Sequence, residues 1–170
     1  MNRSGGQTRW DVFIRDISDV ECKALLERAR IGRLACTRAR QPYIVPVNFA
    51  YANGYLYGFS SPGLKIDWMR ANPRVCVQID EVTSAREWSS VILLGRYREL
   101  PDTPKWKSER LLAWTLAQRI PNWWQPALLR QRSANTAETA KQVWFRIEPA
   151  KITGRQASEP AKAVKSPRPA

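Results

Sequence analysis

Between residues 42 and 68 the chain alternates apolar and polar positions in two short runs that a turn sequence separates. The runs over residues 43–51 and 55–59 are rich in aromatic and β-branched side chains, and they flank Asn53-Gly54. Asn-Gly between such runs is the strongest short-range signal for a β-hairpin, because both residues tolerate positive φ angles. We therefore predict that the two runs pair with each other as a hairpin.

The second run leads into Ser60-Ser61-Pro62-Gly63-Leu64-Lys65, which we call the elbow. Ser61 is suited to cap a helix, and Pro62 fits the first helical position. Backbone N–H groups at a helix start, serine hydroxyls and a lysine are also the groups that bind phosphate. The elbow thus indicates either a phosphate site or a capped helix start, and the pattern alone does not separate the two.

Upstream of the hairpin, the apolar spacing changes to that of a helix. Ser18 and Glu21 have the spacing of a capping box, and Ile17 and Cys22 that of a hydrophobic staple. A helix is expected from this point to about residue 29, with Gly32 as the left-handed residue just past its end.

The periodicity of the rest of the chain predicts a mainly β protein with peripheral helices. Further strands are expected over residues 33–37, 74–82, 88–100 and 143–148, the last extended by 151–155, and helices over 64–71 and 104–120. Asn72-Pro73 ends the first of these helices, and Gly95 indicates a bulge or a close backbone approach. About six strands without regular βαβ alternation predict a six-stranded antiparallel split barrel.

Length and composition favour one domain with ragged ends. The 170 residues are 44% hydrophobic, which is typical of a globular domain. We expect a flexible segment over residues 1–16, a domain over 17–155 with a Trp-rich helical insertion at about 104–141, and a disordered basic tail over 156–170. With no signal peptide or apolar run of membrane length, the expected location is the cytoplasm.

The chemistry available to the side chains is limited, because the chain contains no histidine. This removes the commonest general base and metal ligand, so neither a Ser-His nucleophile nor a metal site is expected. Cys22, Cys36 and Cys76 are widely separated in apolar patterns, and we interpret them as small core residues.

The net charge of +13 favours an anionic partner, whether a nucleotide cofactor, a nucleic acid or a lipid head group. Interleaved Trp and Arg residues leave a nucleic-acid-binding barrel as an alternative function. That alternative is the weaker one, because the basic residues concentrate in the tail and the insertion rather than along one strand.

Several segments, in order along the chain, resemble one known family. They are Ile31-Gly32-Arg33-Leu34-Ala35, the run over residues 43–51, Leu56-Tyr57 with the elbow, Asn72-Pro73-Arg74-Val75, Trp88-Ser89-Ser90-Val91, and Ile152-Thr153-Gly154-Arg155. Together they resemble the pyridoxamine 5'-phosphate oxidase-like split barrels that bind FMN, and within them the branch of the nitroimidazole-resistance proteins. The resemblance covers about residues 17–155.

The resemblance implies a homodimer that binds FMN at the subunit interface and acts on a small molecule, without a membrane or a nucleic acid as partner. The residues that it places at the cofactor are Pro46, Val47 and Asn48 against the flavin ring, Ser60, Ser61 and Lys65 at the phosphate, and Trp88 and Ser90 on a strand that lines the site. For Trp88, packing at the barrel end is an equally good interpretation. Many members of the branch carry a histidine just before the serine of the elbow, where this chain has Gly58 or Phe59.

The function implied is that of a flavin-dependent oxidoreductase, in which the cofactor carries the redox chemistry and no side chain need act as a base. A proton could come from water or from a hydroxyl such as that of Ser90 or Tyr57. The alternatives within the same fold are a deazaflavin-dependent protein and a flavin-storage protein. The Trp-rich segment over residues 106–124 fits a lid, a dimer contact or additional core.

Overall fold

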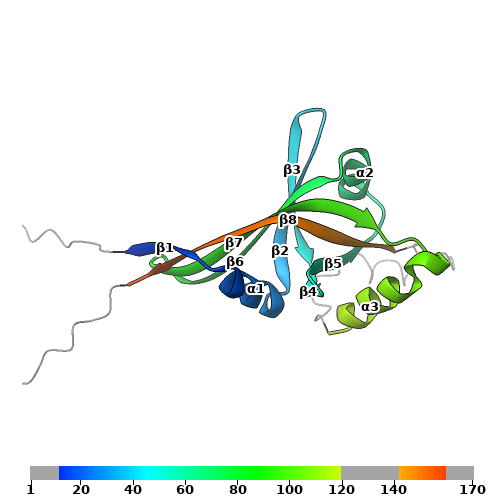
Figure 1. The fold of residues 1–170 in the computed structure, drawn as a ribbon. Coiled ribbons are helices and arrows are strands. Elements are labelled where there is room, and N and C mark those ends of the chain that lie inside the picture. The colour runs from blue at the N-terminus through cyan, green and yellow to red at the C-terminus, as the bar shows by residue number, and fades with distance from the viewer. Residues whose placement is uncertain (1–11, 120–141, 160–170) are drawn as a thin grey trace, which may run out of the picture.

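One antiparallel sheet of eight strands forms the body of the protein, with helices at its margins (Figure 1). The structure is a computed structural model that describes residues 12–119 and 142–159. Its strands are β1 (Phe13–Ile17), β2 (Ile31–Arg38), β3 (Gln41–Asn48), β4 (Ala50–Ala52), β5 (Tyr55–Ser60), β6 (Arg74–Ser84), β7 (Glu87–Glu99) and β8 (Val143–Ser158). Its helices are α1 (Asp19–Arg28), α2 (Leu64–Ala71) and α3 (Lys107–Ala117), and a 3-10 turn at Pro104–Trp106 precedes α3.

The strands follow the order β3-β2-β6-β7-β8-β5-β4, and β1 pairs with the far end of β8. The three longest strands, β6, β7 and β8, form a twisted ribbon that carries β1 and points to the left in Figure 1. The mainly β, antiparallel prediction of a split barrel is confirmed, with eight strands in place of six.

The predicted hairpin is correct at its turn and wrong in its extent. Asn53 and Gly54 have φ angles of 52° and 80°, and they join β4 to β5. Residues 43–51 are not one strand, however, because the chain leaves β3 at Phe49, whose ring is buried and whose N–H donates to the carbonyl oxygen of Arg30 (3.0 Å). β3 instead pairs with β2 through a turn in which Ala39 and Arg40 have positive φ.

Two predicted helix ends are wrong. Gly32 does not terminate α1 but lies inside β2, where a β-carbon would sit 3.2 Å from the ring of Phe49. Close approach, and not a left-handed turn, therefore explains this glycine. Ser61 and Pro62 do not start α2 either, since its N-cap is Gly63, which provides no side-chain cap.

Other local predictions are confirmed. The capping box of Ser18 and Glu21 is formed at α1, and α2 ends at Asn72, whose N–H donates to the carbonyl oxygen of Trp68 (2.8 Å). The strand register shifts between Leu94 and Gly95, where a β-carbon on the glycine would lie 2.7 Å from the carbonyl oxygen of Glu148.

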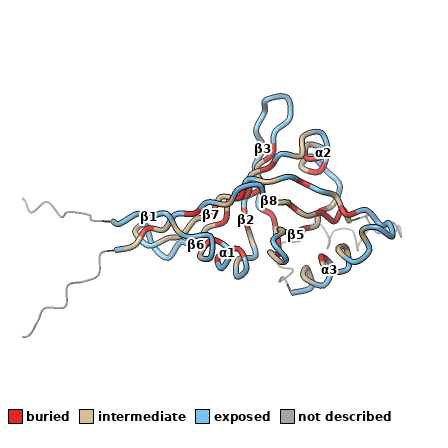
Figure 2. Tube along the Cα trace, in the orientation of Figure 1, coloured by how far each residue is buried: buried red, intermediate tan, exposed pale blue. Residues whose placement is uncertain are grey.

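The core lies between the inner faces of the sheet and the helices α1 and α2 (Figure 2). It contains the predicted alternating positions of β6 and β7, which are Val75, Val77, Ile79, Val91 and Leu93, together with the two buried cysteines, Cys22 and Cys36. A smaller cluster under α3 is built from Tyr57, Leu100, Ala113 and Trp144. Cys76 is only half-buried, so the core interpretation is wrong for this cysteine.

The ends of the domain are more ordered than expected. Residues 13–16, which the sequence places in a flexible segment, form β1 together with Ile17, and residues 156–158, placed in the tail, form the end of β8. The two segments pair with each other, so that Phe13 lies opposite Ser158. β1 carries no alternation of apolar and polar residues, so the apolar pattern of the sequence did not indicate a strand there. The first part of the predicted insertion at about residues 104–141 forms the 3-10 turn and α3, and residues 120–141 lie outside the described residues.

Within residues 12–119 and 142–159, no helix is long and apolar enough to cross a membrane.

Candidate functional site

The elbow joins the end of β5 to the start of α2. Ser60 is the last residue of β5 and is buried, and its hydroxyl donates to the carbonyl oxygen of Ser61 (2.8 Å). Because Gly63 offers no side-chain cap, the first N–H groups of α2 have no acceptor from the N-cap side chain. A helix start of this kind favours an anion.

Lys65 is the second residue of α2 and is partly buried. Burial lowers the pKa of its ammonium group from the ordinary lysine value. It forms no ion pair with any carboxylate in residues 12–119 and 142–159. An anion bound beside Lys65 would restore the interactions that the ammonium group loses on leaving water, so the elbow can hold a phosphate.

Pro46, Val47 and Asn48 lie on β3, which is an edge strand of the sheet. Val47 points into the core, whereas Pro46 is exposed and Asn48 is partly exposed on the other face. One side of the β3 backbone has no strand partner among the described residues, and a proline fits such an edge because it lacks an N–H group. This edge can therefore offer backbone groups to a ligand.

The end of β3 lies close to the strand that carries the elbow. A β-carbon built on Gly58 would be 3.4 Å from the carbonyl oxygen of Asn48, and Gly58 is two residues before Ser60. The structure thus brings Asn48 and the elbow to the same end of the barrel, as a ligand with a ring and a phosphate would need.

Trp88 and Ser90 are not close to the elbow within one chain. Ser90 pairs with Arg155 on β8, whereas Ser60 pairs with Val143, twelve residues away along the same strand. At about 3.3 Å a residue, twelve residues of a straight strand span roughly 40 Å. Both residues lie on the ribbon on the left of Figure 1, away from α2.

One row of the sheet face that carries Pro46 is apolar, whereas the row that contains Pro46 itself carries Arg33 and Gln78. Cross-strand pairing aligns Ile44, Ala35, Cys76 and Leu94 in one row over β3, β2, β6 and β7. Ile44 is 62% exposed and Leu94 is 45% exposed. We call this row the apolar strip.

Gly58, one of the two positions where the resemblance led us to look for a histidine, has no space for a side chain. At Gly58 a β-carbon would lie 2.8 Å from Cζ of Phe145. Phe59 packs its ring against that of Trp144, with ring centroids 5.0 Å apart. Aromatic side chains of β5 and β8 therefore fill the space around Gly58 and Phe59.

Tyr57, one of the hydroxyls considered as a proton donor, is buried under α3. Its hydroxyl donates to Oε2 of Glu109 on α3 (3.4 Å), and burial, followed by the charge of Glu109, raises its pKa. Tyr57 thus keeps its proton at neutral pH. The other candidate, Ser90, accepts a hydrogen bond from Nε2 of Gln78 (3.3 Å).

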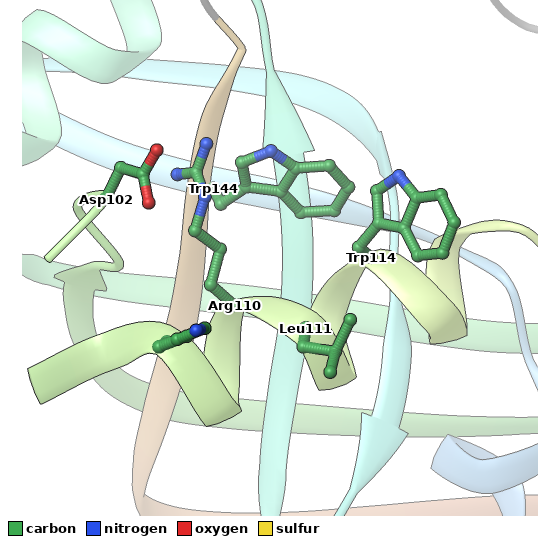
Figure 3. Close-up of a pocket in the computed structure, with 6 residues that line it drawn as sticks. Asp102, Arg110, Leu111, Trp114 and Trp144 are labelled. Carbon is green, nitrogen blue, oxygen red and sulfur yellow. The ribbon is translucent and has the colours of Figure 1, made fainter. Parts of the chain in front are cut away.

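Sequence reasoning did not identify the hollow between α3 and the start of β8 (Figure 3), which has a volume of about 390 Å³. Its described lining residues are Asp102, Lys107, Arg110, Leu111, Trp114 and Trp144. The only signal in the sequence was the aromatic content of the Trp-rich segment, which fitted a lid, a dimer contact or core equally well.

A family model and a relative both match this chain over nearly the whole domain. A family model described as pyridoxamine 5'-phosphate oxidase matches residues 18–156. An uncharacterized protein of Rhizobium meliloti (strain 1021) is 44% identical over 146 residues, which make up 86% of this chain and 97% of the relative.

Solved structures share the fold. The crystal structure of an FAD-binding protein from Mesorhizobium loti has a TM-score of 0.73 and 44% identity, and the match covers 88% of this chain and 100% of that chain. A Bacteroides thetaiotaomicron protein named for 5-nitroimidazole antibiotic resistance has a TM-score of 0.60 at 19% identity, with 88% of this chain and 93% of that chain covered. At that identity the second match shows the fold alone.

Proposed function

Because the chain belongs to the pyridoxamine 5'-phosphate oxidase-like family, we propose that it binds a flavin and acts as a flavin-dependent oxidoreductase. The resemblance to this family found in the sequence is confirmed. Flavin binding draws support from the Mesorhizobium loti relative, which is 44% identical over its full length and is named as an FAD-binding protein.

The observation that carries the proposal is the state of Lys65. A partly buried ammonium group with no carboxylate partner among the described residues lies in the first turn of α2, beside Ser60 and Ser61. Charge-assisted hydrogen bonds from an ammonium group to phosphate oxygens are among the strongest in proteins. We assign the phosphate of the flavin to this elbow, and its ring to the free edge of β3 at Pro46, Val47 and Asn48.

The cofactor that we propose is FMN. A terminal phosphate monoester carries more negative charge than one phosphate of a diphosphate, and so suits a site with one unpaired lysine and a helix start. FAD, as in the name of the relative, and a deazaflavin are the competing cofactors, and all three can be told apart by mass.

We further propose that two copies of the chain form the complete site. Ser90 and Trp88 lie too far from the elbow to reach the same flavin within one protomer, but a second copy would bring its own ribbon to that site. The apolar strip, with Ile44 and Leu94 exposed, is the face that we expect the two copies to bury.

When bound, the flavin would supply the redox chemistry, and the residues of the chain bind it, orient it and exclude water. The elbow fixes the phosphate end, and the apolar strip of a second copy excludes solvent from the ring. Of the two hydroxyls considered, that of Ser90 is the better proton donor, because Tyr57 is buried under α3 and bonded to Glu109.

The test is to extract any chromophore from the purified protein, before and after incubation with FMN, FAD and a deazaflavin, and to identify it by mass. We expect a stoichiometric flavin whose visible absorbance is lost when the flavin is reduced. Protein that acquires none of the three cofactors would contradict the proposal.

A further inference from the structure

The hollow between α3 and the start of β8 has no role in the proposed flavin site. It lies on the side of β5 and β8 that faces α3, because Trp144, which lines it, packs in the cluster under that helix. Val143, one residue earlier and opposite Ser60, belongs to the main core on the other face. A ligand in the hollow would therefore be separated from the elbow by the strands themselves.

Apolar side chains form two walls of this hollow (Figure 3). Trp144 is buried, and its ring is held against that of Phe59. Opposite it, Leu111 and Trp114 lie three residues apart on one face of α3, and they are 61% and 50% exposed. When a ligand covers exposed indole and leucine surfaces, apolar area is removed from water, and this favours binding.

Two cations lie beside these walls. Lys107 and Arg110 form no ion pair with a carboxylate in the part of the chain that the structure describes. Nη1 of Arg110 donates to the carbonyl oxygen of Leu100 (3.1 Å), which fixes the guanidinium and leaves its other N–H donors available. Asp102 is the one acidic group in the described lining, so the lining has a net positive charge.

The nearest acidic residue of α3 is not available to neutralise these cations. Glu109 points to the sheet and accepts from Arg146, whose guanidinium stacks on the ring of Tyr55, 4.2 Å from its centroid. Arg146 also donates to Glu148 (2.8 Å). This partly buried cluster holds α3 against β8, and Lys107 and Arg110, instead of Glu109, line the hollow.

We propose that the hollow is a binding site for a planar aromatic anion. The ring would lie between the indoles of Trp144 and Trp114, in the offset or edge-on geometry that aromatic pairs prefer. The anionic group would reach Lys107 and Arg110. A volume of about 390 Å³ lies within the range of small-molecule sites in proteins.

The experiment measures binding of two probes to the full-length protein by isothermal titration calorimetry, with and without flavin. The probes are 2-naphthoate and 2-naphthylmethanol, which share a ring system and differ in charge. The variants are Trp114→Ala, Lys107→Gln and, as a matched control, Lys151→Gln, an exposed lysine of β8 that does not line the hollow.

We expect saturable one-to-one binding of 2-naphthoate that is about fivefold or more tighter than that of 2-naphthylmethanol. Trp114→Ala should weaken the binding of both probes, and Lys107→Gln should weaken only the binding of 2-naphthoate. Lys151→Gln should change neither affinity. Absence of saturable binding, equal affinity for both probes, or an equal effect of Lys107→Gln and Lys151→Gln would each overturn the inference.

The result is independent of the proposed function. If the protein binds 2-naphthoate but takes up no flavin, the proposed binding site in the hollow is supported and the flavin proposal is contradicted. Flavin uptake without naphthoate binding would contradict the hollow alone.

Discussion

Phe145 occupies the space that a side chain at Gly58 would need. Its Cζ lies 2.8 Å, and its Cε2 3.0 Å, from the position of a β-carbon built on the glycine. The two residues pair directly across β5 and β8, and Phe145 is buried. The absence of a histidine at this point is therefore part of the core packing of this chain.

We predict that Gly58→Ala lowers the free energy of unfolding by about 1–3 kcal/mol, because the core is already filled there. Phe145→Leu should also destabilise the protein, but the double variant should be more stable than the sum of the two single changes predicts. Urea unfolding of the wild type, the two single variants and the double variant gives the coupling energy between positions 58 and 145. Strict additivity of the two changes would show that the contact between Gly58 and Phe145 is not the cause.

Lys65→Met should abolish tight flavin binding without lowering the stability of the flavin-free protein. Burial lowers the pKa of Lys65, so the folded protein holds this proton less tightly than the unfolded chain. The stability of the flavin-free wild type should therefore rise as the pH increases from the folded pKa towards the ordinary lysine value. Thermal melts at neutral and alkaline pH check both statements, and a large drop in melting temperature for Lys65→Met at neutral pH would contradict them.

Glu99 ties β7 to α2, the helix that carries Lys65. Arg70 donates to its carboxylate through Nε (2.9 Å) and Nη2 (2.8 Å), and these hydrogen bonds lower the pKa of Glu99. The contribution of a carboxylate with a lowered pKa is present above its unfolded pKa and is lost as the pH falls through the folded one. Because both side chains are partly exposed, the contribution should be small.

We therefore expect Glu99→Gln to destabilise the protein by about 0.5–1 kcal/mol at pH 7 and the difference to diminish as the pH falls below the ordinary pKa of glutamate. Glu87→Gln is the matched control, since Glu87 is exposed on the same strand and forms no ion pair with any described residue. Denaturant unfolding at several pH values measures the change in the free energy of unfolding for each of the two variants. A loss that is the same at every pH would exclude the ion pair as its origin.

The apolar strip provides a test of the proposed dimer. Leu94→Asp places a charge on the face that we expect two copies to bury, and it should convert a dimer to a monomer and weaken flavin binding. Val20→Asp is the matched control, because Val20 is 77% exposed on α1, away from the strip. Light scattering after size-exclusion chromatography reads the mass of each protein, and a wild-type monomer, or an unchanged dimer for Leu94→Asp, would contradict the proposal.

Features of the fold that depend on neighbours in the sequence could be predicted from it. The capping box at Ser18 and the turn at Asn53-Gly54 are both formed, because each is decided by hydrogen bonds or φ angles within four residues. The partner of β3 could not be predicted in this way. Its pairing with β2 runs through a two-residue turn at Ala39 and Arg40, and positive φ angles are unusual for these residue types, so no local signal marked the turn.

In the candidate site, too, local features could be predicted and contacts between distant segments could not. The sequence places Ser60 and Lys65 together because they are five residues apart across one elbow. It could not indicate that Ser90 lies twelve positions along β8 from the partner of Ser60, nor that α3 leaves a hollow against Trp144. Both are contacts between segments far apart in the chain, for which local patterns hold no information.

The most direct test of the central claim compares FMN with riboflavin, which lacks the phosphate, in equilibrium titrations of wild type and Lys65→Met. We predict that the wild type binds FMN at least about tenfold more tightly than riboflavin, since charge-assisted contacts to phosphate are lost in riboflavin. In Lys65→Met the two ligands should bind with nearly equal, weak affinity. If the wild type binds neither ligand, or if both proteins bind FMN equally well, the assignment of Lys65 and the elbow to a flavin phosphate is wrong.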